Sequence, residues 1–335
     1  MSLPVFEVIR PQSLDSGLEA IRRFGREIQM VAGGTDLIPS MKQGLFSPRA
    51  LLDLKAIQGL DFIQQEADGG LTIGALARVS RLAESRLIAE QYAVLHHAAK
   101  TVASPLLRNM GTLGGNLCLD TRCLYYNQSG FWRESLGYCL KKDGSVCHVA
   151  PAGHFCWAAF SGDLGPALLT LDATIRLVSP SGERTIPISE FYVNDGIART
   201  VRRPDEILIS VHIPASSAGL KGVYKKLRIR QSIDYPLAGV AAVMKRDAVG
   251  TCVTARIALT AVNPSPQIVK AAERLEGKPF DPALIEEVAY EAIRTAKPLR
   301  TSASTMQYRR HMVQVFVRRA LRELWTSNGR TAASS

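Results

Sequence analysis

Residues 28–37 read IQMVAGGTDL and carry the strongest indication of the fold. An apolar, strand-like run ends at Val31, and paired glycines follow at once. A short helical stretch over 36–44 and a second strand over 50–54 come next. Strand, glycine turn, helix and strand in this order predict a small α/β subdomain over residues 1–58.

Residues 109–116, NMGTLGGN, form a second glycine-rich loop. Paired glycines let a backbone adopt positive φ and approach a ligand closely, and successive N–H groups in such a turn form an anion site. Two loops of this build suit the two phosphates of a dinucleotide, while ordinary structural turns remain the alternative. The first loop has neither the G-x-G-x-x-G spacing of a Rossmann fingerprint nor the Gly-Lys-Ser/Thr of a Walker loop.

The remaining pattern predicts a second region over 59–218 and a third over 219–326, followed by a flexible tail at 327–335. The second region has a hairpin (60–65 and 71–73), helical periodicity (79–103), a helix (163–169) and strands (173–178 and 206–213). The third has strands (223–229, 237–245 and 251–259) and then helices (267–276, 282–297 and 304–326). Three strands followed by helices predict an α+β C-terminal domain. One face of its last helix is apolar, with Val313, Phe316, Val317, Ala320, Leu321 and Leu324.

Composition narrows the class of protein. The 335 residues are 46% hydrophobic and 21% charged, which excludes disorder as the main state. No apolar run reaches the roughly 18 residues of a membrane span, and the N-terminus lacks the pattern of a secretory signal, so we expect a cytoplasmic protein without a membrane partner. The net charge of +11 fits either a solvated basic face or a docking surface for another subunit. No RNA-recognition signature accompanies it, and we expect no nucleic-acid partner.

Cysteines are unevenly spread. Five of the six lie between Cys118 and Cys156, and Cys252 stands apart in an apolar strand. We read Cys118 as a small packed residue and the others as a metal-binding set spaced C-x15-C-x7-C-x8-C, namely Cys123, Cys139, Cys147 and Cys156. Zinc and iron–sulfur clusters both fit four thiolates, but the wide spacing favours a cubane cluster over structural zinc. A reduced-cysteine aromatic core is the alternative.

The loop at 31–37, the loop at 112–116 and the segment 163–173 (DLGPALLTLDA) resemble, in the same order, three motifs of the flavoprotein subunits of molybdenum hydroxylases. The resemblance covers about residues 4–325. It implies an α+β fold: an FAD-binding domain of the vanillyl-alcohol-oxidase (PCMH) type in two α/β subdomains, plus a C-terminal α+β domain like that of carbon monoxide dehydrogenase flavoproteins. It also implies noncovalent FAD, with Asp163 near the flavin or ribityl chain and Lys225 beside the isoalloxazine ring. The implied FAD-binding residues are Met30, Val31, Ala32, Gly33, Gly34, Thr35, Asp36, Leu37, Val102, Met110, Gly111, Thr112, Leu113, Gly114, Gly115, Asn116, Asp163 and Lys225.

The cysteine segment is an insertion relative to most of that family, at about residues 121–160. A four-cysteine insert with a [4Fe-4S] cluster resembles the flavin subunits of 4-hydroxybenzoyl-CoA reductases. This resemblance implies an electron-transfer subunit with no catalytic residue of its own, in a dimer of heterotrimers. A large partner would hold the molybdopterin cofactor, a small partner two [2Fe-2S] clusters, and ferredoxin would donate electrons.

Two rival interpretations stay open. The chain is either the FAD subunit of another molybdenum hydroxylase, acting on an aldehyde, a purine, carbon monoxide or an aromatic acid, or a zinc-stabilised scaffold without enzymatic activity. Flavin and iron–sulfur absorbance separates an electron-transfer subunit from a scaffold, and the substrate of the whole complex separates the enzymes.

Overall fold

A computed structural model describes residues 2–326, so the predicted tail at 327–335 lies outside the described residues. The chain begins with a three-stranded parallel sheet in the order β1-β3-β2. β1 spans Glu7–Ile9, β2 Ile28–Val31 and β3 Ala50–Asp53, with helices α1 (Leu14–Phe24) and α2 (Leu37–Lys42) in the connections. Parallel strands need crossover connections, which the two helices supply here. The glycine turn at 33–34 therefore lies at the carboxyl end of β2, directly before α2.

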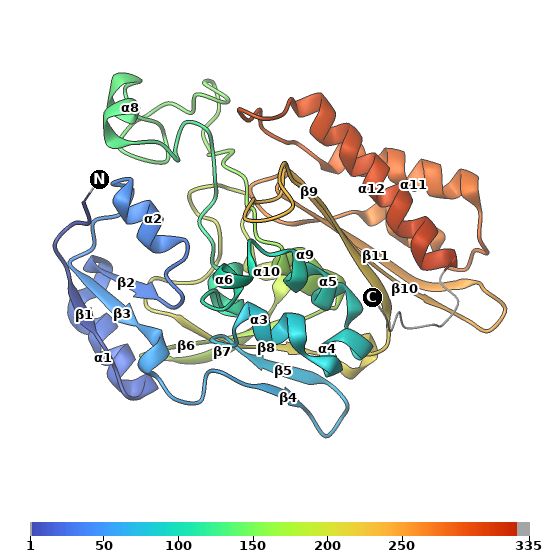
Figure 1. Cartoon of the computed structure of the whole chain (residues 1–335), viewed down its shortest axis with the longest axis horizontal. Helices are drawn as coiled ribbons and strands as arrows, with labels where there is room; N and C mark the ends of the chain where they lie inside the picture. The colour runs from blue at the N-terminus through green and yellow to red at the C-terminus, as the bar shows by residue number, and fades with distance from the viewer. Residues whose placement is uncertain (1, 327–335) are drawn as a thin grey trace.

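A five-stranded antiparallel sheet follows, in the order β4-β5-β8-β6-β7. Its strands are β4 (Ile63–Gln65), β5 (Leu71–Gly74), β6 (Thr174–Ser179), β7 (Gly182–Pro187) and β8 (Ile207–Ile213). Short helices cover one face of this sheet in Figure 1, among them α3, α4 and α5. The helices of this region are α3 (Val79–Glu84), α4 (Arg86–Gln91), α5 (Ala93–Thr101), α6 (Pro105–Arg108), α7 (Leu113–Leu117), α8 (Gly130–Ser135), α9 (Leu164–Thr170) and α10 (Ile188–Phe191).

The last sheet is antiparallel, in the order β12-β11-β10-β9. Its strands are β9 (Lys221–Leu227), β10 (Ala238–Arg246), β11 (Cys252–Thr260) and β12 (Gln267–Ile268), and helices α11 (Pro282–Thr295) and α12 (Met306–Thr326) follow. Both faces are covered. Ala241 and Val243 join the core around α5 and α9, whereas Val240 and Ala242 pack with α11 and α12. Because both faces are buried, β10 reads as a continuous apolar run instead of an alternating one.

The predicted elements and the structure differ in several places, of which three concern the sheets and the longest helical stretch. The helical periodicity over 79–103 is divided among α3, α4 and α5, with breaks at Ser85 and Tyr92. The predicted helix at 267–276 is instead the two-residue strand β12 followed by a 3-10 segment at Lys270–Leu275, so the C-terminal sheet has four strands where three were expected. Strand β7 was not predicted, because its sequence GERTIP is polar and its burial is low. The predicted apolar face of α12 is buried as expected.

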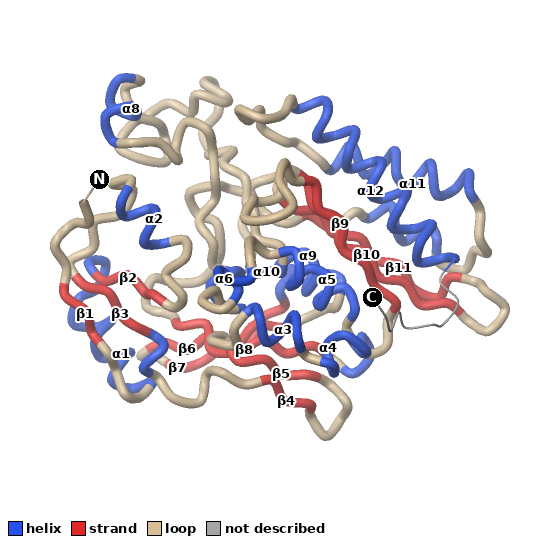
Figure 2. Tube along the Cα trace, in the orientation of Figure 1, coloured by secondary structure: helices blue, strands red, loops and turns tan. Residues whose placement is uncertain are grey.

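The cysteine segment between α7 and α9 consists mostly of loops, with α8 as its only helix among the described residues (Figure 2). It rises from the middle of the molecule, and α8 lies near α2 in Figure 1. Arg133 of α8 makes that contact, since its Nη2 donates to the carbonyl oxygens of Gln43 (3.0 Å) and Gly44 (3.2 Å) at the end of α2. Within residues 2–326, no helix combines the length and apolarity that a membrane crossing requires.

Candidate functional site

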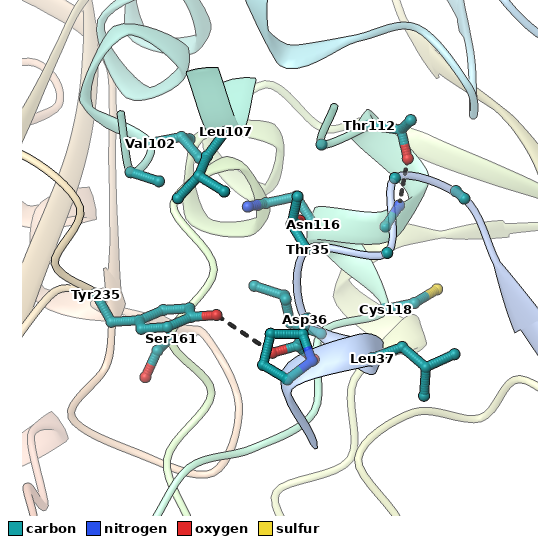
Figure 3. Close-up of a pocket in the computed structure, with 18 of the residues that line it drawn as sticks. Thr35, Asp36, Leu37, Val102, Leu107, Thr112, Asn116, Cys118, Ser161 and Tyr235 are labelled. Atoms are coloured by element: carbon teal, nitrogen blue, oxygen red, sulfur yellow. Dashed lines mark hydrogen bonds between the residues drawn. The ribbon is translucent and has the colours of Figure 1, made fainter. Parts of the chain in front are cut away.

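The two glycine loops line one cavity of about 380 Å3 at the centre of the molecule (Figure 3). They approach each other closely, since a Cβ added to Gly33 would lie 1.9 Å from the carbonyl oxygen of Met110. Gly34 has a φ of +70°, which side chains other than glycine rarely adopt. Within the described residues, no backbone N–H of positions 33–36 donates a hydrogen bond. The loop therefore offers free donors to an anionic ligand.

The second loop is held rigid by its own side chains. Thr112 caps α7, because its Oγ1 accepts a hydrogen bond from the Gly115 amide at 3.1 Å. Asn116 Oδ1 accepts from the Leu164 amide at 3.0 Å and so fixes the start of α9 against α7. Helix α9 and the second loop thus form one preorganised wall of the cavity.

Most of the predicted FAD-binding residues line this cavity, and four do not. Leu113 is buried in the core, Gly114 packs against Ala75, and Met110 contributes its backbone next to Gly33, with its side chain exposed. Lys225 lies elsewhere, as described below. The predicted residues that line the cavity are Met30, Val31, Ala32, Gly33, Gly34, Thr35, Asp36, Leu37, Val102, Gly111, Thr112, Gly115, Asn116 and Asp163.

Sequence reasoning missed several residues of the cavity wall. Leu107 lies on α6, and Arg122 and Ser161 come from the two ends of the cysteine segment. Ile233 and Tyr235 come from the loop between β9 and β10. No local motif marks them, because they reach the cavity only through tertiary folding. Cys118, read above as a packed residue, also lines the cavity.

A second cavity of about 180 Å3 adjoins the first. Both are lined by Asp36, Thr112, Gly115 and Cys118, and the second continues between apolar side chains such as Leu208. The glycine loops therefore lie where the two cavities meet. This arrangement suits a long ligand with its phosphates at the centre and one ring system at each end.

Buried charge beside the cavity comes from Lys226 and not from Lys225. Lys226 Nζ lies 2.9 Å from Asp163 Oδ2, and the two side chains are 2% and 4% exposed. Tyr224 donates to Asp163 Oδ1 at 2.7 Å. Burial raises the pKa of Asp163, and the Lys226 ammonium opposes that shift.

The expectation for Lys225 is therefore corrected. Alternate residues of a strand face opposite sides, so Tyr224 and Lys226 face Asp163 while Lys225 points to α12. There Lys225 forms an ion pair with Glu323. Lys226 does not line the cavity itself, but its ammonium pairs with Asp163, which does.

Three side chains from distant parts of the chain meet at the edge of the cavity. Arg122 Nη2 pairs with Asp36 Oδ1 and donates to the Tyr235 hydroxyl at 2.7 Å. Its guanidinium lies 3.9 Å from the centre of the Tyr235 ring. Tyr235 also donates to Asp36, the contact drawn in Figure 3. This group joins the first glycine loop, the cysteine segment and the β9–β10 loop.

The four predicted metal-binding cysteines line one small cavity of their own. All four are free thiols; Cys139, Cys147 and Cys156 are buried and Cys123 is partly buried. Burial raises the pKa of the Cys156 thiol to about 11, and the Ala158 amide and Lys141 oppose that shift. Among the described residues, no three His, Cys, Asp or Glu side chains are arranged to hold a metal ion.

Comparisons with known proteins follow this geometry. Residues 4–216 match the family model described as the FAD binding domain in molybdopterin dehydrogenase, and residues 222–324 match the CO dehydrogenase flavoprotein C-terminal domain. The chain is 35% identical over 254 residues to the aldehyde oxidoreductase FAD-binding subunit PaoB of Escherichia coli K12, covering 73% of this chain and 78% of that one. It is 28% identical over 324 residues to the carbon monoxide dehydrogenase medium chain of Hydrogenophaga pseudoflava, covering 96% and 98%.

Solved structures agree with these matches. The carbon monoxide dehydrogenase structure from Hydrogenophaga pseudoflava superposes with a TM-score of 0.81 at 28% identity, over 97% of this chain and 99% of that chain. The expected α+β fold, with an FAD-binding domain and a carbon monoxide dehydrogenase-like C-terminal domain, is confirmed. The chain belongs to the family of FAD-binding medium subunits of molybdenum hydroxylases.

Proposed function

We propose that this chain is an electron-transfer subunit that holds FAD between its two glycine loops and a [4Fe-4S] cluster in its cysteine insert. The observation that carries the proposal is the gathering of Cys123, Cys139, Cys147 and Cys156 around one cavity. These residues are far apart in the insert, whose backbone is mostly loop. A loop of this length needs something to hold it, and four free thiols, three of them buried and one partly buried, suit a metal centre.

The first cavity fits FAD by its chemistry. Gly33 and Gly34 leave room for a ligand to approach the backbone, and the free N–H groups of 33–36 suit a pyrophosphate. Bound there, FAD would supply storage for one or two electrons. Asp163 and Lys226 would lie beside it as a fixed, buried ion pair, and Tyr235 would close the cavity from the C-terminal domain.

The second site fits a cluster better than a zinc ion. A structural zinc ion takes four ligands at about 2.3 Å from one point, and no three metal-binding side chains of the described chain are arranged around such a point. A cubane has its iron atoms at separate corners, so its thiolate ligands surround a volume. Tyr125, Tyr126 and Ala158 are among the other residues of the cavity wall and would limit the access of solvent.

For the substrate of the complete enzyme, we favour an aldehyde. The support is the likeness to the aldehyde oxidoreductase subunit of Escherichia coli, at 35% identity. The glyceraldehyde dehydrogenase medium chain of Sulfolobus acidocaldarius is also similar, at 26% identity over 96% of this chain. The expected reduction of 4-hydroxybenzoyl-CoA with ferredoxin electrons receives no support from these relatives, and we keep it only as the weaker alternative.

The proposed assembly follows from the same relatives, two of which are named as medium chains. We propose a large subunit with the molybdenum cofactor and a small subunit with [2Fe-2S] clusters as partners, in a dimer of heterotrimers. The substrate would then bind on the large subunit, and this chain would contribute no catalytic residue.

Iron and acid-labile sulfide analysis of the anaerobically purified complex tests the cluster. We expect about four irons and four sulfides for each copy of this chain above those of the partner subunits. Serine variants of Cys123, Cys139, Cys147 and Cys156 should lose them, while Cys252→Ser, a buried cysteine on β11, should keep them. Zinc in place of iron would refute the cluster.

Substrate-dependent dye reduction tests the substrate class. We expect the complex to oxidise aromatic or aliphatic aldehydes with an artificial acceptor. Dehydroxylation of 4-hydroxybenzoyl-CoA with a low-potential donor, and no turnover of aldehydes, would favour the alternative.

A further inference from the structure

Lys141 is a buried cation in the wall of the cysteine cavity. It lies two residues after Cys139 and lines the same cavity as the four thiols. Its side chain is only 7% exposed, and the Asp120 carboxylate with which it pairs at 2.7 Å is 9% exposed. Burying a lysine among thiols costs free energy unless its charge is paired, and here Asp120, directly before the segment, is the partner.

The ammonium group has no hydrogen left for a sulfur atom. Its three donors are used by Asp120 Oδ1, by the Thr121 carbonyl oxygen at 3.0 Å and by Thr121 Oγ1 at 2.5 Å. The ring of Tyr126 lies 4.2 Å away and covers the group further. Lys141 therefore acts on the cavity through its charge and not through a hydrogen bond.

A second cation, Arg199, lies beside the carboxylate that pairs with Lys141. Asp120 also accepts from the Tyr126 hydroxyl at 2.8 Å and lies 3.4 Å from Arg199 Nη1. Two cations thus face one carboxylate. Burial would raise the pKa of Asp120, but Lys141 and Arg199 hold it below its ordinary value, so the carboxylate is charged. Asp120 and Arg199 line the second cavity described above, the one of about 180 Å3. Lys141, which lines the cavity of the four thiols, connects to it through its ion pair with Asp120.

From this placement, and resting on the cluster proposed above, we infer that the buried charge of Lys141 raises the reduction potential of the iron–sulfur cluster. Reduction adds a negative charge to a cluster that four thiolates already make anionic. A fixed cation at low dielectric stabilises the reduced form more than the oxidised form. Removing the charge should lower the potential, and keeping it on another side chain should not.

The test is a redox titration of the anaerobic complex, followed by the electron paramagnetic resonance signal of the reduced cluster. Lys141→Gln removes the charge and keeps an amide donor for Asp120, and Lys141→Met removes both. Lys141→Arg keeps the charge. Lys142→Met is the matched control, because Lys142 pairs with Asp143 and does not line the cavity. Iron and sulfide are measured on every variant before the titration.

We expect Lys141→Gln and Lys141→Met to hold full iron and to titrate at a lower potential than the wild type, with Lys141→Arg and Lys142→Met unchanged. Full iron with an unchanged potential in the neutral variants would overturn the inference. Loss of iron from both neutral variants but not from Lys141→Arg would also overturn it, since the lysine would then be needed for assembly and not for tuning. Absence of a cluster from the wild type would instead refute the proposed function.

Discussion

Arg122 and Cys123 are neighbours in the chain, and each lines a cavity that the other does not. Arg122 lines the dinucleotide cavity and pairs with Asp36 of the first glycine loop, and Cys123 lines the cysteine cavity. The cysteine insert thus begins in the wall of the cavity proposed to hold FAD. Because one peptide bond joins Arg122 to Cys123, we expect a change of the backbone at either cavity to affect the other.

A side chain at position 33 should weaken FAD binding. The Cβ of Gly33→Ala would lie 1.9 Å from the Met110 carbonyl oxygen, which is backbone and has little freedom to move. The two glycine loops would have to separate. We expect at least about tenfold weaker FAD binding, equivalent to about 1.4 kcal/mol, measured by fluorescence titration of the deflavinated protein.

Gly130→Ala is the control for this prediction. A Cβ there meets only the end of the Arg133 side chain, at 3.8 Å, and the residue lies outside the FAD cavity. Its FAD affinity should equal that of the wild type. Equal affinity of Gly33→Ala and the wild type would show that the loop does not hold the cofactor.

Neighbouring lysines on β9 should respond very differently to removal. Lys226→Met leaves the buried Asp163 carboxylate without its cation, which costs about 3–5 kcal/mol of stability. Lys225→Met breaks a more exposed pair with Glu323, where the lysine is 29% and the glutamate 47% exposed, and costs about 0–1 kcal/mol. Thermal unfolding and the FAD content after gel filtration measure both effects. A larger loss of FAD from Lys225→Met than from Lys226→Met would instead support the place beside the isoalloxazine ring that the sequence suggests for Lys225.

The glycine loops were predictable from sequence because their function depends on local backbone freedom. Gly33, Gly34 and Gly115 lie at the cavity because a short motif encodes both the turn and the approach of the ligand. The sequence also predicts the four cysteines as one set, and they line one cavity, while their role as metal ligands stays a prediction.

Residues of the remaining site could not be found in this way. Tyr235 and Ile233 reach the cavity from a loop about 200 positions after the first glycine turn, and only the packing of the C-terminal domain brings them there. The exchange of Lys225 for Lys226 has another cause. The register of β9 decides which lysine faces Asp163, and a shift of one residue inverts every side chain of a strand.

Acid should remove a stabilising contribution of Glu206. Its buried carboxylate accepts from Arg184 Nε at 2.7 Å and from the Arg203 amide at 2.6 Å. Burial would raise the pKa of Glu206, but these hydrogen bonds hold it below the ordinary value of 4.5. Because the folded pKa is the lower one, the stabilisation is complete above about pH 4.5 and is lost as the pH falls through the folded pKa.

Glu206→Gln should therefore lower stability by about 2 kcal/mol at pH 7, and the difference from the wild type should shrink as the pH falls from about 4.5 through the folded pKa of Glu206. Thermal unfolding at a series of pH values measures this. Glu183→Gln is the control, because its pair with Arg176 is exposed and should contribute about 0–1 kcal/mol. A difference for Glu206→Gln that persists at low pH would show that the charge is not its source.

Arg133 should couple the insert to the first glycine loop. Its side chain is buried, and it donates to Gln43 and Gly44 at the end of α2, whose other end begins at the glycine turn and is held by Arg122 through Asp36. Arg133→Met removes both of these hydrogen bonds, which leaves two carbonyl oxygens without this partner and costs about 1–3 kcal/mol. Helix α2 should then move more freely. We expect FAD to bind up to about tenfold more weakly, because the loss of binding free energy should not exceed the loss of stability.

Limited proteolysis separates this coupling from general unfolding. Cleavage in the insert, at residues such as Lys142, should accelerate in Arg133→Met while the C-terminal domain stays resistant. Arg86→Met serves as the control, since Arg86 is 90% exposed and pairs only with Glu90 on its own helix. Faster cleavage of the insert with an unchanged FAD affinity would mean that α2 holds the glycine loop without help from the insert, and the two cofactor sites would then be independent.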